Sequence, residues 1–333
     1  PNSRPVTFHE SIDTQLEIES GLESVSGNLK LWLDASQSDY MEKDSSNRVS
    51  KWQDLSGSSH HVSQSDSSKK PEVKKSSVQN TQDIVYFEDD LLELSEFKDW
   101  PTADITLFII QKSDIKSQST LALDGIRKNK EGRFNLHIPW GNNNIYWDYG
   151  DTGSSYGRLA KSITASGTSF NANNYYIYEF SFNNDSKQLE MYKNAVQLGV
   201  TTTGVTSVAN VNGKTGYTLN IGNDENIANN PFKGDIGEIM IFNKDLSPEE
   251  SIKITHYLAK KWGLEDSVDS DGDGVVDSID TAPLNPDKYT VEDPVIGAKI
   301  FKGLEQQKYS GYFNDDLSHF TSNRKNGYAS LVT

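Results

Sequence analysis

The stretch that decides the fold is FKGDIGEIMIFNKDLSPEESIKITHYLAKKWGL, residues Phe232–Leu264. Residues 236–242 of this stretch are almost continuously apolar, interrupted by one glycine and one glutamate. A short apolar run of this kind is typical of a strand that is covered on both faces. The polar residues Asn-Lys-Asp follow it directly. We therefore predict a buried strand that ends in a turn.

The second half of the stretch carries the signals of a helix. Ser247 offers an oxygen to the free amides of a helix start, Pro248 fits the first helical position, and Glu250 completes a capping box. Apolar residues recur at helical spacing up to Trp262, and Gly263 supplies a left-handed cap. A doubly covered strand followed by one short packed helix indicates the last strand of a two-sheet sandwich.

The same stretch carries a family resemblance. The pattern G-x-I-x-E, then seven residues, then L-S-x-x-E resembles the end of laminin G-like, concanavalin A-like jelly rolls; its residues are Gly234, Ile236, Glu238, Leu246, Ser247 and Glu250. The opening of that fold resembles LKLWLDAS at 29–36 and VSKWQDLSG at 49–57. The resemblance implies an all-β fold, a two-sheet concanavalin A-like jelly roll with one short C-terminal helix.

The remaining strands are predicted from alternation and apolar runs. ITLFIIQ, residues 105–111, is the most apolar of them and is expected at the centre of a sheet. Residues 134–140 and 145–149 alternate around a polar loop and predict a hairpin. A second pair is expected around 183–186, whereas the Ser- and Lys-rich residues 63–82 are expected to form a long surface excursion.

Composition limits the classes of partner. The chain has 333 residues, a hydrophobic share of 34%, a formal net charge of −16 and no cysteine. The negative charge argues against nucleic acid and anionic membranes as partners. The absence of cysteine excludes disulfides, thiolate metal sites and a cysteine nucleophile. No apolar run approaches the roughly 20 residues of a membrane span.

The chain divides into four predicted parts. We expect a lead segment at 1–26, the jelly roll at 27–266, a cation-binding linker at 267–290, and an extension or the start of a following domain at 291–333. The chain begins at Pro1 without a methionine, and it resembles a segment of a longer protein that carries further domains.

The sharpest chemical signal is DSDGDGVVDSID, residues 269–280. Hard cations such as Ca²⁺ take six to eight oxygens, and loops of the EF-hand type supply them from positions 1, 3, 5, 7, 9 and 12, with glycine at position 6. The corresponding residues are Asp269, Asp271, Asp273, the Val275 carbonyl, Asp277 and Asp280, with Gly274 at position 6. We predict a Ca²⁺ site here. The alternative is a solvated acidic linker.

The residues after this loop exclude an EF-hand. Two prolines in TAPLNPD, residues 281–287, rule out the second helix that an EF-hand requires. The whole string resembles a single thrombospondin type 3 repeat without its cysteines, as in linkers of bacterial surface adhesins. That resemblance implies a secreted or cell-surface protein.

A second cation site is predicted in the loop NDENIANN before Pro231. Asn223, Asp224, Asn229 and Asn230 gather oxygens at a strand end. The same composition is also that of an ordinary polar turn, and both interpretations stay open.

Ligand binding is predicted at the aromatic-rich hairpin. Four residues there combine a stacking surface with hydrogen-bonding groups: Tyr146, Asp148, Tyr156 and Arg158. Trp140 and Trp147 are in register with inward-facing residues, and we expect them in the core rather than at a sugar.

The predicted function is non-catalytic, lectin-like carbohydrate binding in an extracellular adhesive protein, with a glycan as partner. A laminarinase-type glycosidase carries the acids of an E-x-D-x-x-E string on one strand, but the match in this chain, at Glu88, Asp90 and Glu93, spans a turn predicted at 89–90. A G-x-S-x-G match at 153–157 lies in a polar stretch with no helix predicted after it, and there is no P-loop motif. We therefore predict that the chain is not an enzyme. Protein or peptide adhesion and a structural spacer are the alternatives, and a degenerate glycosidase ranks last.

Overall fold

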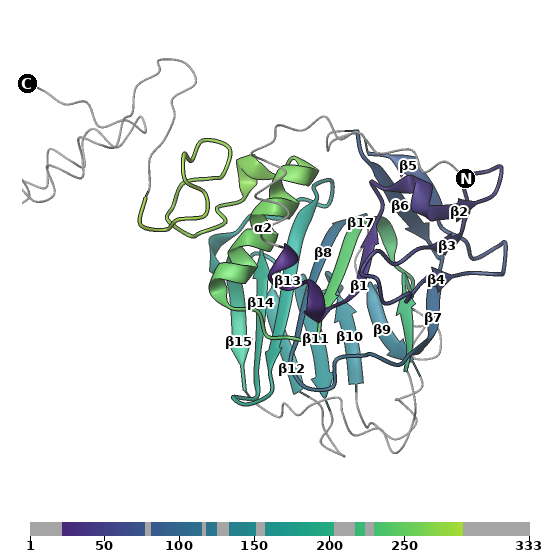
Figure 1. Ribbon diagram of the computed structural model, residues 1–333, viewed down its shortest axis with the longest axis horizontal. Helices are drawn as coiled ribbons and strands as arrows, with labels where there is room; N and C mark the ends of the chain where they lie inside the picture. The colour runs from purple at the N-terminus through teal and green to yellow at the C-terminus, as the bar shows by residue number, and fades with distance from the viewer. Residues whose placement is uncertain are drawn as a thin grey trace, which may run out of the picture.

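Two antiparallel sheets packed face to face form the fold. The computed structural model describes residues 22–76, 81–114, 118–124, 133–150, 157–202, 217–223 and 230–288. Figure 1 shows the sheets with the helix α2 (Pro248–Trp262) lying outside them. This is the predicted all-β, concanavalin A-like jelly-roll sandwich with one short C-terminal helix.

The strands divide between a sheet next to α2, called here the helix-side sheet, and an opposite sheet. In spatial order the helix-side sheet contains β15 (Val196–Thr201), β14 (Gln188–Lys193), β13 (Tyr176–Asn183), β8 (Ile105–Ser113), β17 (Lys233–Phe242), β6 (Asp83–Glu88) and β5 (Glu72–Lys75), and β1 (Leu29–Asp34) also pairs with β17. The opposite sheet contains β12 (Gly157–Ser162), β11 (Asn144–Gly150), β10 (Arg133–His137), β9 (Leu121–Asp124), β16 (Tyr217–Ile221), β7 (Leu92–Phe97), β4 (Val62–Ser63), β3 (Val49–Trp52) and β2 (Met41–Lys43). Short 3-10 turns occur at η1 (Ser26–Asn28), η2 (Ser38–Tyr40), η4 (Ala165–Gly167) and η5 (Glu265–Ser267).

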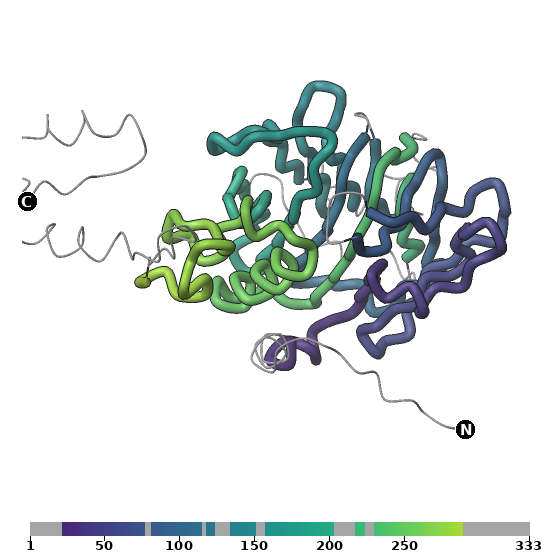
Figure 2. The backbone as a smooth tube through the Cα atoms, turned by 90° about the horizontal axis from the view of Figure 1, so that it is seen from above, coloured from purple at the N-terminus to yellow at the C-terminus, as the bar shows by residue number. Residues whose placement is uncertain are grey.

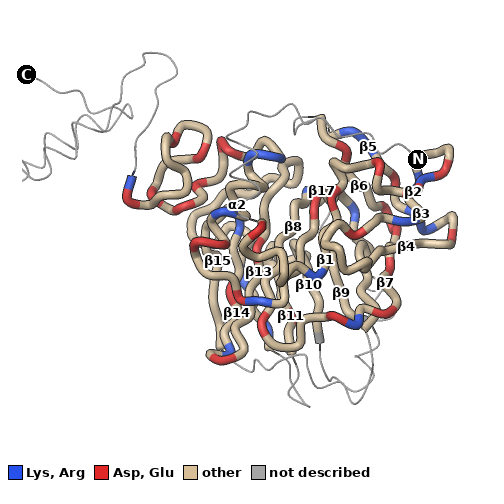
Figure 3. The backbone as a smooth tube through the Cα atoms, in the orientation of Figure 1, with Lys and Arg blue, Asp and Glu red and all other residues tan. Residues whose placement is uncertain are grey.

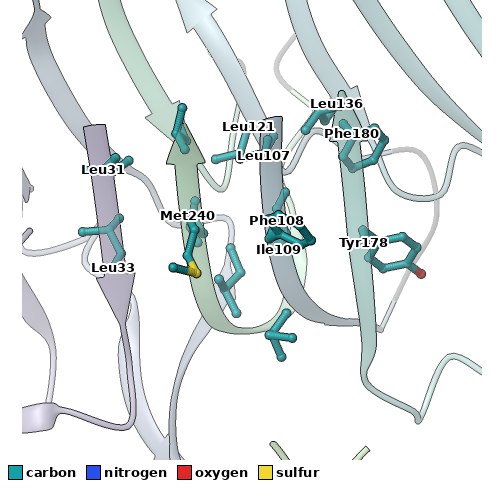
Figure 4. Packing of buried hydrophobic residues seen from close by; sticks show 14 of the residues in the cluster. Leu31, Leu33, Leu107, Phe108, Ile109, Leu121, Leu136, Tyr178, Phe180 and Met240 are labelled. Atoms are coloured by element: carbon teal, nitrogen blue, oxygen red, sulfur yellow. The ribbon is translucent and has the colours of Figure 1, made fainter. Parts of the chain in front are cut away.

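The core lies between the two sheets. Inward-facing side chains of β1, β8 and β13, among them Leu31, Leu107 and Phe180 in Figure 4, meet side chains from the opposite sheet. Aromatic pairs connect the layers, because the Trp147 ring of β11 lies 5.4 Å from the Phe180 ring of β13. Burial of these apolar faces is the main stabilising contribution to a sandwich of this kind.

Strands β8 and β17 form the centre of the helix-side sheet, and the central position of β8 was predicted. β8 pairs with β13 on one side and with β17 on the other. Along its other edge, β17 pairs with β6 through residues 233–236 and with β1 through residues 238–242. The register shifts at Gly237, where a Cβ atom would lie 2.7 Å from the Trp262 ring. The glycine therefore lets α2 approach the sheet closely.

The helix α2 begins and ends at the predicted residues. The Ser247 side chain accepts a hydrogen bond from the Glu250 amide, and the Glu250 carboxylate accepts one from the Ser247 amide at 2.8 Å, which completes the capping box. Gly263 closes the helix in the left-handed conformation, with φ 61° and ψ 40°. Seen from above, α2 lies beside the sheets and the following segment extends away from them (Figure 2).

A buried polar network fixes α2 to the sheet. Lys261 donates to Asp34 at 2.6 Å and to Glu238 at 2.8 Å. Glu238 also accepts from the indole nitrogens of Trp32 and Trp262, at 2.6 and 2.7 Å. Burial raises the pKa of Glu238, and Lys261 opposes that shift. The conspicuous glutamate of the G-x-I-x-E pattern is therefore the centre of a structural network.

Several strands differ from the sequence prediction. The predicted surface excursion 63–82 contains β5, whose Val73 is 8% exposed and belongs to the core, so that prediction was wrong for this segment. Strands β2, β4 and β12 were also not predicted. β2 and β4 have only three and two residues, and β12 lies at a sheet edge, where glycine and lysine interrupt the alternation.

Candidate functional site

The predicted cation loop follows α2 and is fixed to the sandwich. The Asp277 amide donates to the Val268 carbonyl at 2.8 Å, and the Asp277 carboxylate accepts from Ser270 at 2.6 Å and contacts His256 of α2 at 3.0 Å. The Asn194 side chain in the β14–β15 turn donates to Ser267 just before the loop. Both ends of the loop are thereby positioned by the sandwich.

Three of the predicted ligands come together. Ligand oxygens of Asp269, Asp271 and Asp273 all lie within 4.8 Å of one another. The Oδ2 atoms of Asp271, Asp273 and Asp280 are inaccessible to solvent. No hydrogen-bond donor in the described part of the chain reaches any of the three. A buried carboxylate oxygen without a donor is costly, so it needs either a proton or a cation.

The electrostatics of the loop agree with its geometry. Burial, with the neighbouring carboxylates as a further cause, raises the pKa of Asp271 to about 6. Burial and the charges of other loop aspartates also raise the pKa values of Asp273 and Asp280. A divalent cation would remove this repulsion. The set of aspartate oxygens is the type that Ca²⁺ takes.

Asp277, Gly274 and Val275 contribute to the conformation of the loop. Both oxygens of Asp277 are already hydrogen-bonded, so this residue holds the loop together in this structure instead of pointing an unpaired oxygen at the cluster. Gly274 has φ 96°, which gives the bend expected at position 6. The Val275 amide donates to Asp273 at 2.8 Å. The Ca²⁺ assignment stays a prediction.

Only half of the second cation candidate lies in the described residues. Asn223 is fully buried, and the Asn230 carbonyl accepts from the Ser119 amide at 2.9 Å. Asp224 and Asn229 lie outside the described residues. This site also stays a prediction.

The predicted ligand residues converge on the outer face of the opposite sheet. Asp148 of β11 pairs in register with Arg158 of β12, and the guanidinium binds the carboxylate through two hydrogen bonds, at 2.5 and 2.8 Å. The same guanidinium lies 4.9 Å from the centre of the Tyr146 ring. Asn142 donates to the Tyr146 hydroxyl at 2.6 Å. Tyr156, the fourth predicted residue, lies outside the described residues.

Trp140 extends the aromatic surface. Its ring lies 4.7 Å from that of His137, which in turn lies 6.5 Å from the ring of Tyr146. Trp147 is fully buried, as predicted, but Trp140 is half-buried, so the prediction that places it in the core was wrong. Trp140 lies beyond the end of β10 at His137, so the inward and outward alternation of that strand no longer applies to it.

Sequence reasoning missed two amides on the same face. Asn135 pairs with Asp148 across the sheet, and the row continues through Ala122 to Asn220. Asn220 has no accessible surface, and neither its side-chain oxygen nor its nitrogen finds a partner among the described residues. The alternation in Tyr217–Ile221 was a usable signal, because Leu219 and Ile221 point inward and Asn220 therefore outward.

Comparison with protein families supports the fold. Residues 88–250 match the model of a laminin G-type family described as the concanavalin A-like lectin/glucanases superfamily. A comparison with curated proteins found no match. No helix in the described residues is long and apolar enough to cross a membrane.

Solved structures with a similar arrangement have low identity to this chain. The CBM40 domain of the Ruminococcus gnavus IT-sialidase is 18% identical over 46% of this chain and 84% of that one, with a TM-score of 0.38. Domain 4 of AbnA, an extracellular arabinanase of Geobacillus stearothermophilus in complex with arabinotriose, is 13% identical over 67% and 96%, with a TM-score of 0.47. The receptor-binding domain of a botulinum neurotoxin mosaic serotype C/D is 18% identical over 72% and 54%, with a TM-score of 0.45. At this level of similarity, no ligand transfers from these proteins to this chain.

Proposed function

We propose that the sandwich is a non-catalytic carbohydrate-binding module and that the surface around Tyr146, Asp148, Arg158 and Trp140 is its sugar-binding face. The observation that supports it is the combination of two partly exposed aromatic rings with a fixed carboxylate–guanidinium pair on one face. Aromatic rings pack on the apolar C–H faces of sugars, and fixed charged groups orient the hydroxyls.

The same geometry disfavours catalysis. A retaining glycosidase needs two carboxyl groups about 5 Å apart. The cross-strand neighbours of Asp148 are Asn135 and Arg158, and Arg158 engages both of its oxygens. Glu238 is held in the network under α2. In the described part of the chain, neither carboxylate is placed to act as a general acid or nucleophile.

A glycan array with and without Ca²⁺ identifies the ligand class, and two variants test the face. Tyr146→Ala and Arg158→Ala should each weaken binding of the best array ligand by about 1 kcal/mol or more, as truncations at binding hot spots do. Tyr86→Ala and Lys74→Ala are matched controls, because Lys74 lies 3.6 Å from the Tyr86 ring on the helix-side sheet. These controls should bind as the parent does.

Two results would refute the sugar-binding face. One is parental affinity in both Tyr146→Ala and Arg158→Ala. The other is an equal loss in the Tyr86 and Lys74 controls. Protein adhesion or a spacer role would then be the better interpretation of the sandwich.

We further propose that the loop 269–280 binds one Ca²⁺ through Asp269, Asp271, Asp273 and Asp280, with the Val275 carbonyl as a further ligand. The support is the set of donor-free, inaccessible oxygens of Asp271, Asp273 and Asp280, together with the Asp269 oxygen that lies within 4.8 Å of those of Asp271 and Asp273. Asp277 holds the loop against Ser270 and His256 in this assignment. Ca²⁺ would stiffen the segment that leaves the sandwich.

The proposed setting is a secreted or cell-surface adhesive protein. Ca²⁺-dependent extracellular modules work at free Ca²⁺ of about 10⁻⁴ to 10⁻³ M, a range that loops held by carboxylates can match. Secretion of the full-length protein from its native host, measured by surface protease sensitivity, tests this setting.

A further inference from the structure

A groove lies between α2 and the outer face of the helix-side sheet. It has a volume of about 410 Å³, within the range of small-molecule sites. Its lining residues include Glu179 and Ser181 of β13, Glu190 and Tyr192 of β14, Ser251 of α2 and Asp271 of the cation loop. The groove is separate from the Tyr146 face, which belongs to the other sheet.

The groove concentrates negative charge. Glu179, Glu190 and Asp245 line it, and none of its lining residues is lysine or arginine. Burial raises the pKa of Glu179 to about 7, and the charges of Glu190 and Asp245 contribute. Burial also raises the pKa of Asp245. Figure 3 shows acidic positions around α2 and the neighbouring strands.

Glu179 is the group that points to a ligand. Its side chain lines the groove although the residue is only 8% exposed. Its Oε1 accepts from the Ser251 hydroxyl, whereas no donor in the described part of the chain reaches its Oε2. In contrast, both oxygens of Glu190 are hydrogen-bonded, by Gln188 and Tyr192. Oε2 is therefore the atom of this largely buried carboxylate that a donor or cation in the groove can reach.

The geometry favours an organic cation over a metal ion. Three carboxylate oxygens within 4.8 Å of one another occur in the Asp269–Asp273 cluster, but not among Glu179, Glu190 and Asp245. The groove also carries hydroxyl and amide groups, including Ser181, Asn183 and Gln188. Such a lining matches the hydroxyls of a sugar better than the apolar stem of a lysine side chain.

We propose that this groove is a second ligand site and that it binds a protonated amino sugar, with the ammonium group on Glu179. The ammonium donates to the free Oε2 and is held by the negative field of Glu190 and Asp245. The ring hydroxyls bind the amide and hydroxyl side chains of the floor. Tyr192 offers its ring as the apolar surface.

Calorimetric titration with a glucosamine trisaccharide at pH 7, in the presence of a chelator, tests the proposal. The parent should bind this probe, and the N-acetylated trisaccharide, which lacks the ammonium, should bind at least tenfold more weakly. Glu179→Gln should lose about tenfold or more in affinity while keeping an oxygen for Ser251. The charge-matched control Glu96→Gln, on the opposite sheet, should bind as the parent does.

A further variant and a further probe distinguish this site from the other proposed site. Tyr146→Ala should leave trisaccharide binding unchanged, so failure at the Tyr146 face and failure in the groove are distinguishable. No binding by the parent, equal affinity for the acetylated probe, or an unchanged affinity in Glu179→Gln would overturn the proposal. Tighter binding of trilysine than of the trisaccharide would replace the amino sugar with a basic peptide.

Discussion

Two clusters of carboxylates lie next to α2, and they differ in whether the protein supplies hydrogen-bond donors to them. Under the helix, Asp34 and Glu238 are buried, and Lys261 and two indoles bond to them. After the helix, oxygens of Asp269, Asp271 and Asp273 lie within 4.8 Å of one another, and Asp271, Asp273 and Asp280 each have an inaccessible oxygen that no described donor reaches. The first cluster is satisfied internally and therefore fixes structure. The second is not, and it is therefore the proposed Ca²⁺ site.

The largest effect is expected from breaking the satisfied cluster. Lys261→Met removes the cation and leaves Asp34 and Glu238 as uncompensated buried charges. We expect a loss of about 3–5 kcal/mol in the free energy of unfolding, measured by urea denaturation. Lys253→Met, at an exposed position of the same helix, should change stability by less than about 0.5 kcal/mol. A similar small effect in both variants would show that the network does not fix α2.

A smaller effect is expected at Glu179, where one oxygen is satisfied and the other is not. Its pKa is about 7 in the folded state against 4.5 without the fold, so the folded state holds the proton more tightly. The parent should therefore lose stability as pH rises from about 4.5 to above 7, by up to about 3 kcal/mol. Glu190, Asp245 and Asp271 are the charged groups that line the same groove.

The Glu179→Gln variant has no titratable group at this position, so its comparison with the parent isolates the pH dependence that Glu179 contributes to stability. The stability of the variant relative to the parent, from denaturation at pH 5 and pH 8, should increase between the two pH values. Glu96→Gln should show no such increase. A flat difference for Glu179→Gln would mean that the buried carboxylate is compensated by a contact that the structure does not show.

The sequence indicates the acidic loop more clearly than the buried network, because the aspartates of the loop are close together in the sequence. Five aspartates and a glycine within a dozen residues define the loop without any tertiary information. Glu238, by contrast, is bonded by Trp32, which is 206 positions away, and by residues of a helix packed across the sheet. Such a network depends on register, which the sequence alone does not specify.

Edge strands and turns were the other features that the sequence predicted poorly. The register of β14 and β15 depends on a turn in which Asn194 and Ala195 have positive φ, 49° and 66°. Two-residue hairpin turns require that conformation, and an alanine there conceals the usual glycine signal. β5 was missed because Val73 is its only buried residue and the two lysines that follow it are not buried. At the Tyr146 face, the sequence predicted four ligand residues, of which Tyr146, Asp148 and Arg158 lie together and Tyr156 is outside the described residues. It did not predict the buried amide of Asn220 on a distant strand.

The most direct measurement of the difference between the two clusters is calorimetric titration of the metal-stripped protein with Ca²⁺. One Ca²⁺ should bind per chain, and Ca²⁺ at 100 times its dissociation constant should stabilise the ordered loop by about 2.7 kcal/mol. The double variant Asp271→Ala/Asp273→Ala should show no binding at this site and remain folded. The double variant Asp39→Ala/Asp266→Ala removes two exposed aspartates outside the loop and should bind as the parent does. No Ca²⁺ uptake by the parent, or undiminished uptake by Asp271→Ala/Asp273→Ala, would contradict the account.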